Sequence, residues 1–290
     1  MPGQDPISWV SAVSTGSVRI RPEHIGPTRK NVYLWLVTSR EWTGPLPIHA
    51  YVIEHREGLV LFDTGQDRAG VTEPTYFPSG FTGFLYDRLA RFDIGPDQTL
   101  TRQLAALGRD IGDVHTVVLS HLHQDHIGGL PELGHASIVV SDREWSAMQR
   151  PLPALRGFLR NHIELDGLRW SRVHPEPLGD PSLMPFTTGH DLFGDGSLVV
   201  LPTPGHTAGS TSLLVRRPGH PPLLMVGDLT YDADLLAAGT VPGVGNKRQM
   251  RRAVAAVSGL RRRMPGLTVL AAHDPAAAAR LSASLNTRTP

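Results

Sequence analysis

The chain has 290 residues, 40% of them hydrophobic, and its 28 lysines and arginines against 27 aspartates and glutamates leave a formal net charge of +1. This length and apolar content are enough for a full hydrophobic core, and we expect a single domain spanning residues 1–290. The near-neutral charge gives no general attraction to nucleic acid or to an anionic membrane, and the absence of cysteine excludes disulfides and thiolate metal sites.

Residues 1–6 lack a basic patch followed by a long apolar stretch, so we predict no signal peptide. No apolar run approaches the roughly 18 residues of a membrane span. We therefore expect a soluble, cytoplasmic protein.

β-Branched and apolar residues predict the first strands of a sheet. Residues 17–20 and 31–38 have strand character, the second through alternating apolar side chains. Residues 48–55 and 59–65 flank a short turn, which predicts a β-hairpin whose second strand ends near Asp63.

An inserted loop rich in aromatic residues is expected from about residue 66 to 96. Its large side chains are Pro74, Tyr76, Phe77, Pro78, Phe81, Phe84, Leu85 and Tyr86. Such a loop beside a cleft either forms a wall of the substrate site or only anchors itself to the core, and the sequence favours neither. A helix is predicted next over residues 97–107, with Asp97 as its N-cap and Gly108 at its end.

Metal-binding chemistry is concentrated in residues 120–129. A β-branched run over residues 115–120 predicts a buried strand, and three histidines and an aspartate follow it within six residues. In an extended chain His121 and His123 point to the same side. Imidazole and carboxylate ligands suit zinc, and also manganese or iron. This spacing predicts a metal site where the strand ends.

Strands and helices alternate through the rest of the chain. We predict strands at residues 137–140, 198–201, 212–215, 223–228 and 268–271, and helices at residues 141–149, 151–166, 247–264 and 276–285. Three of these strands lead to His206, Asp228 and His273, and Asp228 occupies the place in its hairpin that Asp63 occupies in the first. Two related halves of this kind predict an α/β protein, an αβ/βα sandwich of two mixed β-sheets flanked by helices.

The predicted helix at residues 247–264 has a basic face, formed by Arg251, Arg252, Arg261, Arg262 and Arg263. Such a face either contacts nucleic acid or is simply solvated. Since no aromatic side chains accompany the arginines, a solvated face is favoured and no nucleic-acid or membrane partner is expected.

The pattern His-x-His-x-Asp-His over residues 121–126 resembles the signature of the metallo-β-lactamase superfamily of metal-dependent hydrolases. The family's remaining ligand motifs resemble residues 203–207, 227–228 and 272–274, in the same order along the chain. The resemblance covers about residues 61–273 and implies the same sandwich, with the ligands at strand ends.

The resemblance also implies two divalent metal ions. Seven side chains would hold them: His121, His123 and His206 at one ion, Asp125, His126 and His273 at the other, and Asp228 between the two. Zinc is the first expectation, with iron, manganese or cobalt as alternatives. Asp63 is expected to orient a ligand imidazole through its free N–H, and the alternative is a turn-forming aspartate before Gly65.

Asp228-Leu229-Thr230-Tyr231 resembles the N-acyl homoserine lactonases, the quorum-quenching group of this superfamily. That resemblance implies attack of a metal-bridging hydroxide on the ester carbonyl of a small lactone, and a homodimer. Asp125 would act as general acid and base besides binding metal, and Tyr231 would donate a hydrogen bond to the developing oxyanion. Ser210 and Ala208 depart from the group, which commonly has histidine and proline there.

Other reactions of the superfamily are alternatives, namely thioester hydrolysis of the glyoxalase II kind, aryl ester hydrolysis and phosphodiester hydrolysis. A phosphodiesterase favours cationic groups near the metals, for which Arg143, Arg150 and Arg156 are the candidates. Redox chemistry at a single iron or with a flavin partner is disfavoured, because the seven-ligand set is complete and the chain lacks room for a flavin domain. A non-catalytic metal-binding module is disfavoured because no ligand is missing.

Overall fold

The computed structural model of the protein describes residues 5–28 and 30–287. Within these residues, thirteen strands form one sheet of seven and one sheet of six. Residues 1–4, which belong to the segment predicted to lack a signal peptide, lie outside the described part of the chain.

The first sheet has the strand order β4-β1-β2-β3-β5-β6-β7. Its strands are β1 (Ile7–Ile20), β2 (Leu46–His55), β3 (Gly58–Phe62), β4 (Ala90–Asp93), β5 (Val114–Val118), β6 (Ser137–Ser141) and β7 (Arg169–Val173). Strands β4, β1, β2 and β3 pair antiparallel, whereas β3, β5, β6 and β7 pair parallel. The sheet is mixed, and the carboxyl ends of its parallel strands share one edge.

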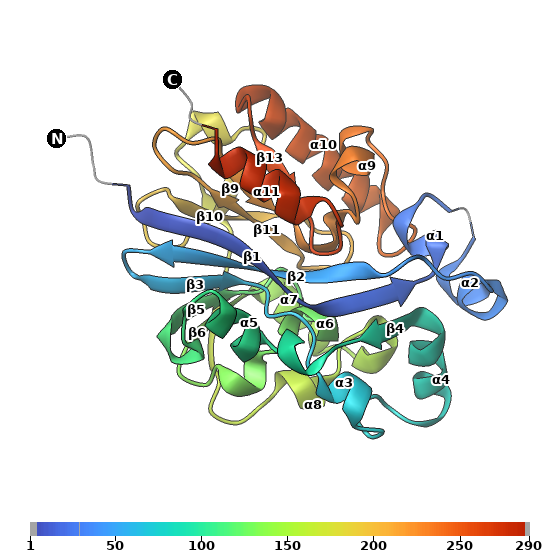
Figure 1. The fold of residues 1–290 in the computed structure, drawn as a ribbon. Helices are drawn as coiled ribbons and strands as arrows, with labels where there is room; N and C mark the ends of the chain where they lie inside the picture. Colours follow the sequence, from blue (N-terminus) through green and yellow to red (C-terminus); the bar gives the residue numbers. More distant parts are fainter. Residues whose placement is uncertain (1–4, 29, 288–290) are drawn as a thin grey trace.

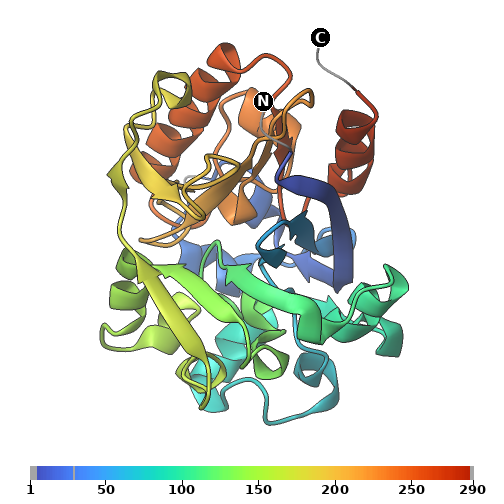
Figure 2. The ribbon, with the colours of Figure 1, turned by 90° about the vertical axis from the view of Figure 1, so that its left-hand side faces the viewer.

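The second sheet has the order β13-β12-β11-β10-β9-β8. Its strands are β8 (Glu176–Pro177), β9 (Thr188–Asp191), β10 (Leu198–Pro202), β11 (Thr211–Val215), β12 (Leu223–Met225) and β13 (Thr268–Leu270). All neighbours are antiparallel except β12 and β13. Figure 2 shows the two sheets as separate layers, the second in yellow and orange above the first in blue and green.

Helices cover the outer faces of both sheets. The α-helices are α1 (Pro22–Ile25), α2 (Val32–Thr38), α3 (Ala69–Thr72), α4 (Gly80–Leu89), α5 (Leu100–Ala106), α6 (Gln124–Ile127), α7 (Asp142–Met148), α8 (Arg160–Ile163), α9 (Ala233–Ala237), α10 (Lys247–Arg263) and α11 (Ala277–Leu285). Short 3-10 helices are η1 (Pro96–Gln98), η2 (Ile111–Asp113), η3 (Leu130–Glu132), η4 (Pro153–Arg156), η5 (Pro181–Leu183) and η6 (Gly227–Leu229). In Figure 1, α9, α10 and α11 lie above the sheets and α5 and α8 below them.

Period-two alternation along the strands builds the core. Tyr51 and Ile53 of β2 belong to the cluster between the sheets, while Val52 belongs to the cluster beneath the helices of the first sheet. In β10, Val200 faces inward and Leu201 faces the outer helices. Because both faces of central strands such as β3 and β10 are covered by apolar groups, these strands are almost wholly hydrophobic. The predicted αβ/βα sandwich is confirmed.

The prediction of a strand over residues 31–38 is wrong, because residues 32–38 form helix α2. Val32, Trp35 and Leu36 are spaced as one face of a helix and pack with Leu85 of α4. Leu34 and Val37 on the other face are 55% and 59% exposed. The alternation of apolar residues was therefore too short to distinguish a strand from an amphipathic helix.

The segment from residue 66 to 96 contains α3, α4 and β4. The predicted helix at 97–107 begins later than expected, because its N-cap is Thr99, whose hydroxyl accepts a hydrogen bond from Arg102 N, and Asp97 lies in the preceding 3-10 turn.

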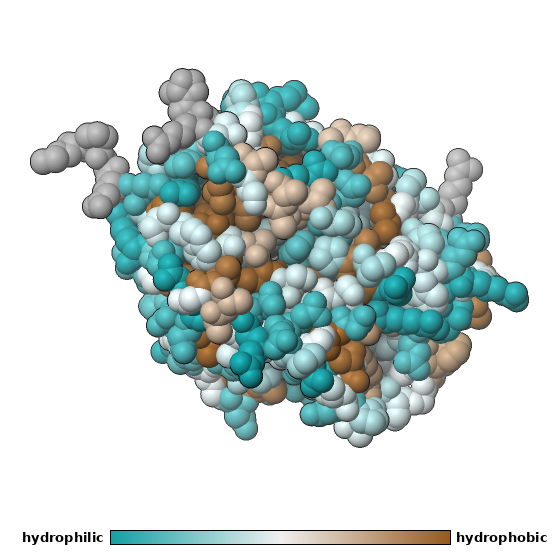
Figure 3. All heavy atoms as spheres, viewed as in Figure 1, coloured by the Kyte–Doolittle hydropathy of each residue, from teal (hydrophilic) through white to brown (hydrophobic). Residues whose placement is uncertain are grey.

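The face seen in Figure 3 is mainly hydrophilic, with hydrophobic side chains in separate small patches. Among the described residues, no helix combines the length and the apolar character that crossing a membrane requires.

Candidate metal centre

The predicted ligands follow the ends of strands in both sheets. His121 and His123 lie in the loop after β5, and Asp125 and His126 lie in helix α6, which begins directly after that loop. The second sheet provides the other three: His206 between β10 and β11, Asp228 in η6 after β12, and His273 after β13. The structure brings all seven together in three overlapping groups.

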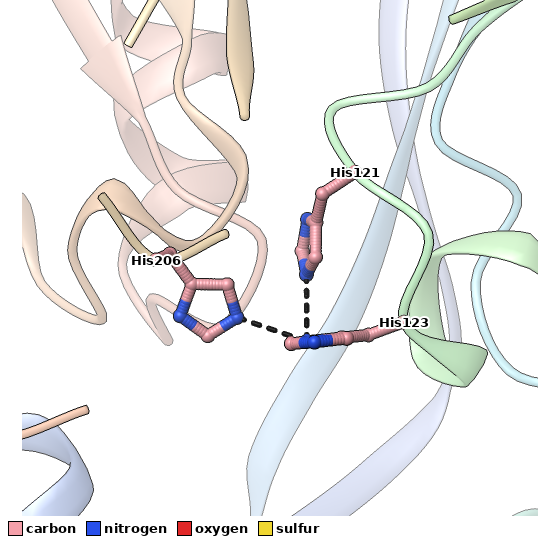
Figure 4. A group of neighbouring side chains, drawn as sticks. All are labelled: His121, His123 and His206. Atoms are coloured by element: carbon pink, nitrogen blue, oxygen red, sulfur yellow. Dashed lines mark hydrogen bonds between the residues drawn. The ribbon is translucent and has the colours of Figure 1, made fainter. Parts of the chain in front are cut away.

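Three histidines form the first group (Figure 4). Nδ1 of His123 lies 3.1 Å from Nε2 of His121 and 3.0 Å from Nε2 of His206. The ligand atoms of tetrahedral zinc, with bonds of about 2.0–2.1 Å, lie roughly 3.3 Å apart. These nitrogens are thus slightly closer together than they would be around one ion.

Two more histidines and two aspartates join the neighbouring groups, one of which also includes His121. Nε2 of His126 lies 3.2 Å from Oδ1 of Asp228, and Nε2 of His273 lies 3.4 Å from the same oxygen. Oδ2 of Asp125 lies 3.5 Å from Nε2 of His273. The other oxygen of Asp228, Oδ2, lies 3.5 Å from Nε2 of His206. The carboxylate of Asp228 therefore faces both the three-histidine group and the group of His126 and His273, as a bridging ligand must.

The buried polar atoms of the centre fit a divalent ion. Nε2 of His126 and Oδ1 of Asp228 are both buried and, among the described residues, neither has a hydrogen-bond partner. Burial alone would raise the pKa of Asp125, but the facing imidazoles of His126 and His273 outweigh it and hold that pKa at about 2. Burial opposes ionisation of Asp228 as well, yet His273, His126 and His206 keep its pKa well below the usual range. Both side chains are therefore carboxylates.

Side-chain hydrogen bonds fix which ring nitrogen of His126 and of His121 faces the centre. Nδ1 of His126 donates to Oδ2 of Asp63 over 2.9 Å, and Nδ1 of His121 donates to the Ser120 hydroxyl over 2.9 Å. That hydroxyl donates in turn to Asp63 Oδ2, and Asp63 Oδ1 accepts from Ser120 N. Asp63 therefore contacts an imidazole as expected, and its left-handed backbone, with φ of 60°, also turns the chain.

Backbone carbonyls orient two more histidines. Nε2 of His123 lies 3.1 Å from the Arg156 carbonyl oxygen, and Nδ1 of His273 lies 2.8 Å from that of Pro47. Each N–H donates outward, so the opposite nitrogen keeps its lone pair for a ligand position inside the centre.

Tyr231 lies at the edge of the centre. Its hydroxyl donates to Asp228 Oδ2 over 3.1 Å, and its ring stacks on His273 at 5.6 Å between centroids. The His24 ring makes an edge-to-face contact with the same ring, with the centroids 6.2 Å apart, and Trp35 contacts His24 in the same manner with the centroids 5.0 Å apart. Burial and the nearby carboxylates raise the pKa of Tyr231 well above its usual value, so the phenol is a neutral donor.

The aromatic segment is partly anchored and partly exposed. The Tyr76 ring packs on His162 at 4.1 Å, and the Tyr86 hydroxyl donates to the Ala154 carbonyl over 3.0 Å. Phe81 and Phe84 are 70% and 48% exposed. Burial raises the pKa of both tyrosines, and the charges of Asp67 and Asp125 add to the shift of Tyr76. The Ala154 carbonyl belongs to η4, which also contains the Arg156 carbonyl beside His123, so Tyr86 is attached to a segment that contacts the centre.

Glu144 was missed as a site residue, since the sequence indicated only a position in the first turn of the helix predicted at residues 141–149. The structure buries it completely and gives it three hydrogen-bond donors, Leu122 N, Thr207 Oγ1 and Gly209 N. Burial raises its pKa to about 7, although each of these donors lowers it. No local sequence pattern could have found contacts made by residues so far apart in the chain.

Ser210 and Ala208, the two residues that depart from the pattern of the lactonases, lie in the loop between β10 and β11. Ser210 Oγ accepts a hydrogen bond from Thr207 N.

Comparisons with known proteins agree with this geometry. Residues 43–273 match the family described as the metallo-beta-lactamase superfamily. The chain is 30% identical to the N-acyl homoserine lactonase AttM of Azorhizobium caulinodans over 232 residues, 79% of this chain and 82% of that protein. It is 31% identical to the probable metallo-hydrolase Rv2300c of Mycobacterium tuberculosis over 280 residues, 91% of this chain and 86% of that one.

Solved structures show the same fold. An N-acyl homoserine lactone hydrolase with bound N-hexanoyl-L-homoserine matches with a TM-score of 0.73 and 18% identity, over 95% of each chain. AidC, a dizinc quorum-quenching lactonase, matches with a TM-score of 0.57 and 18% identity, over 93% of this chain and 90% of that one. The chain therefore belongs to the metallo-beta-lactamase superfamily and is a metal-dependent hydrolase.

Proposed function

We propose that this protein opens lactone rings, N-acyl homoserine lactones above all, using two divalent ions held by His121, His123, Asp125, His126, His206, Asp228 and His273. The main support is the position of Tyr231 beside the seven candidate ligands. Its hydroxyl lies 3.1 Å from Oδ2 of Asp228, whose carboxylate faces both the three-histidine group and the group of His126 and His273. Relatives about 30% identical over most of the chain are named as N-acyl homoserine lactonases. Zinc is the first choice of metal, and a structural neighbour is described as a dizinc enzyme.

The chemistry supplied by two bound divalent ions is a nucleophilic water at neutral pH and a polarised lactone carbonyl. Asp125 is ionised and close to His273, so it can accept the proton of that water and return it to the leaving ring oxygen. Tyr231 is neutral and can donate to the carbonyl oxygen as negative charge develops there. The cytoplasmic location and the homodimer stay predictions from the sequence.

Phosphodiester hydrolysis is less well supported. The guanidinium of Arg156 donates to the carbonyl oxygens of Pro151, Ala147 and Arg150. A side chain bound in this way is not free to hold a phosphate. Of the three arginines considered as phosphate-binding groups, Arg156 is therefore engaged by the backbone.

The experiment measures kcat/KM of the zinc-loaded protein with N-acyl homoserine lactones of several chain lengths, simple lactones, thioesters, aryl esters and phosphodiesters. We expect the largest values for lactones, and loss of that activity in Asp228→Asn, which shows that the turnover belongs to this centre. Strong phosphodiester turnover without lactone turnover would refute the proposal.

A further inference from the structure

Glu144 contacts two loops that carry metal ligands. Its Oε1 accepts a hydrogen bond from Leu122 N over 3.1 Å, and its Oε2 accepts from Thr207 Oγ1 over 2.7 Å and from Gly209 N over 2.9 Å. Leu122 lies between His121 and His123, and Thr207 directly follows His206. A single carboxylate is thus attached next to all three histidines of the first group.

The two loops belong to different sheets. The loop of Leu122 follows β5 in the first sheet, whereas the loop of Thr207 connects β10 and β11 in the second. Figure 4 shows the histidines of these loops meeting from opposite sides. The 3.0 Å separation of His123 Nδ1 and His206 Nε2 therefore depends on how the two loops are held relative to each other.

The second loop approaches the helix of Glu144 very closely. A Cβ atom on Gly209 would lie 2.1 Å from Glu144 N, a distance that no side chain tolerates. Thr207 is fixed further by Ser210, whose hydroxyl accepts from Thr207 N over 3.0 Å. The loop is therefore seated against α7 at several atoms, and Glu144 joins that contact to the first loop.

Only a carboxylate satisfies this arrangement. Leu122 N and Gly209 N are obligatory donors, and they contact different oxygens of Glu144. The amide of a glutamine at this position would turn its NH₂ group toward one of them, which leaves a buried backbone N–H without an acceptor. The substitution Glu144→Gln keeps the size of the side chain and breaks the link on one side.

We propose that Glu144 is a positioning residue that sets the spacing of the three-histidine metal position by linking the ligand loops of the two sheets. The inference rests on the proposed metal site and not on the lactone assignment. Residues that orient metal ligands typically change metal affinity by 10- to 100-fold when they are altered.

The test is a zinc titration against a chromophoric chelator at pH 8, which resolves the binding steps without any assay of activity. We expect Glu144→Gln to weaken one zinc-binding step about tenfold or more and to leave the other within about threefold. Thr207→Val removes one donor and should weaken the same step by less, while Thr207→Ser keeps the hydroxyl and should restore it. Asp195→Asn is the control, because that carboxylate also accepts several hydrogen bonds but lies outside the centre.

The inference would be overturned if Glu144→Gln left the zinc affinity of both binding steps unchanged. It would also be overturned if Thr207→Val and Thr207→Ser lost the same zinc affinity, or if Asp195→Asn lost as much zinc affinity as Glu144→Gln. The threonine pair keeps the test decisive if Glu144→Gln does not fold. A wild-type chain that binds zinc in two steps but opens no lactone refutes the proposed function and leaves this inference intact. A wild-type chain that binds fewer than two zinc ions refutes both.

Discussion

The Tyr231 hydroxyl donates to Asp228, the carboxylate that faces both groups of candidate ligands, and the proposed function places the lactone carbonyl there. We predict that Tyr231→Phe lowers kcat about 100-fold, the usual effect of losing one oxyanion donor, while the metal content stays at the wild-type value. Under the proposed function, Asp125→Asn would remove both a metal ligand and the group that carries the proton, so we expect its loss of turnover to be far larger and to be accompanied by loss of metal.

Tyr51→Phe is the matched control for this prediction. This substitution also removes a buried hydroxyl, which donates to the Ala271 carbonyl over 2.9 Å between the sheets. We expect it to cost about 1 kcal/mol of stability and to leave kcat unchanged. Equal kcat values for wild type and Tyr231→Phe would show that Tyr231 only packs against His273.

His24 gives the fold a dependence on pH. Burial lowers its pKa to about 4 from 6.5, although the carboxylates of Asp228 and Asp125 raise it. Between these values the unfolded chain binds a proton that the folded chain does not. The stability contributed by neutral His24 is therefore complete above about pH 6.5 and is lost as the pH falls toward 4, by about 2–3 kcal/mol at pH 4.5.

The substitution His24→Phe keeps an aromatic ring against Trp35 and Tyr231 but cannot titrate. Urea unfolding of chelator-treated protein at pH 7.5 and 4.5 measures the effect. We expect acidification from pH 7.5 to 4.5 to lower the free energy of unfolding of the wild type by about 2–3 kcal/mol more than that of the variant. The same loss in both proteins would mean that His24 is protonated in the fold.

At the scale of elements, a glycine turn fixes the segment that orients His123. Gly157 follows η4 with φ of +84°, and a Cβ atom there would lie 2.5 Å from His123 Nε2. Gly167 has nearly the same φ, +83°, but open space around it. We predict that Gly157→Ala and Gly167→Ala both lose about 1 kcal/mol of stability from the strained backbone, and that only Gly157→Ala weakens zinc binding. Equal zinc affinity in the two variants would contradict this role for the turn.

The same turn shows what the sequence could not predict about the elements. Residues 151–166 were expected to form a second helix, but Gly157 separates η4 from α8 in a left-handed conformation. Long amphipathic elements such as α10 were predicted almost to the residue, because Asn246 caps its first turn and Met250, Val254 and Val257 repeat at helical spacing. Short elements such as α2 were not, since a few apolar residues fit either period.

The residues of the candidate centre also differ in how far the sequence predicts them. His121, His123, Asp125 and His126 form a dense local pattern, so the sequence predicts their convergence directly. The link through Glu144 joins residues that are 22 to 65 positions apart in the chain, which no spacing rule records. A contact of Asp63 with one of the ligand imidazoles was expected only because Asp63 ends a strand like that of Asp228, and the sequence did not indicate that this imidazole is His126.

At the scale of the whole molecule, the sandwich explains why one centre needs both halves of the chain. The loop after β5 and helix α6 provide four of the seven side chains, and the strands of the second sheet lead to the other three. The apolar cluster between the sheets, which includes Tyr51, Phe62, Val200 and Met225, holds the two ligand edges together. Bound metal should therefore stabilise the packing of one sheet on the other.

The number of metal ions bound per chain shows whether the centre holds two ions with Asp228 between them. After loading with zinc and exhaustive dialysis, the metal in each chain is measured by mass spectrometry, for the wild type and for Asp228→Ala, which lacks the carboxylate facing both groups. We expect two zinc ions per wild-type chain and fewer than two in the variant. One ion or none in the wild type, or two in the variant, would contradict it.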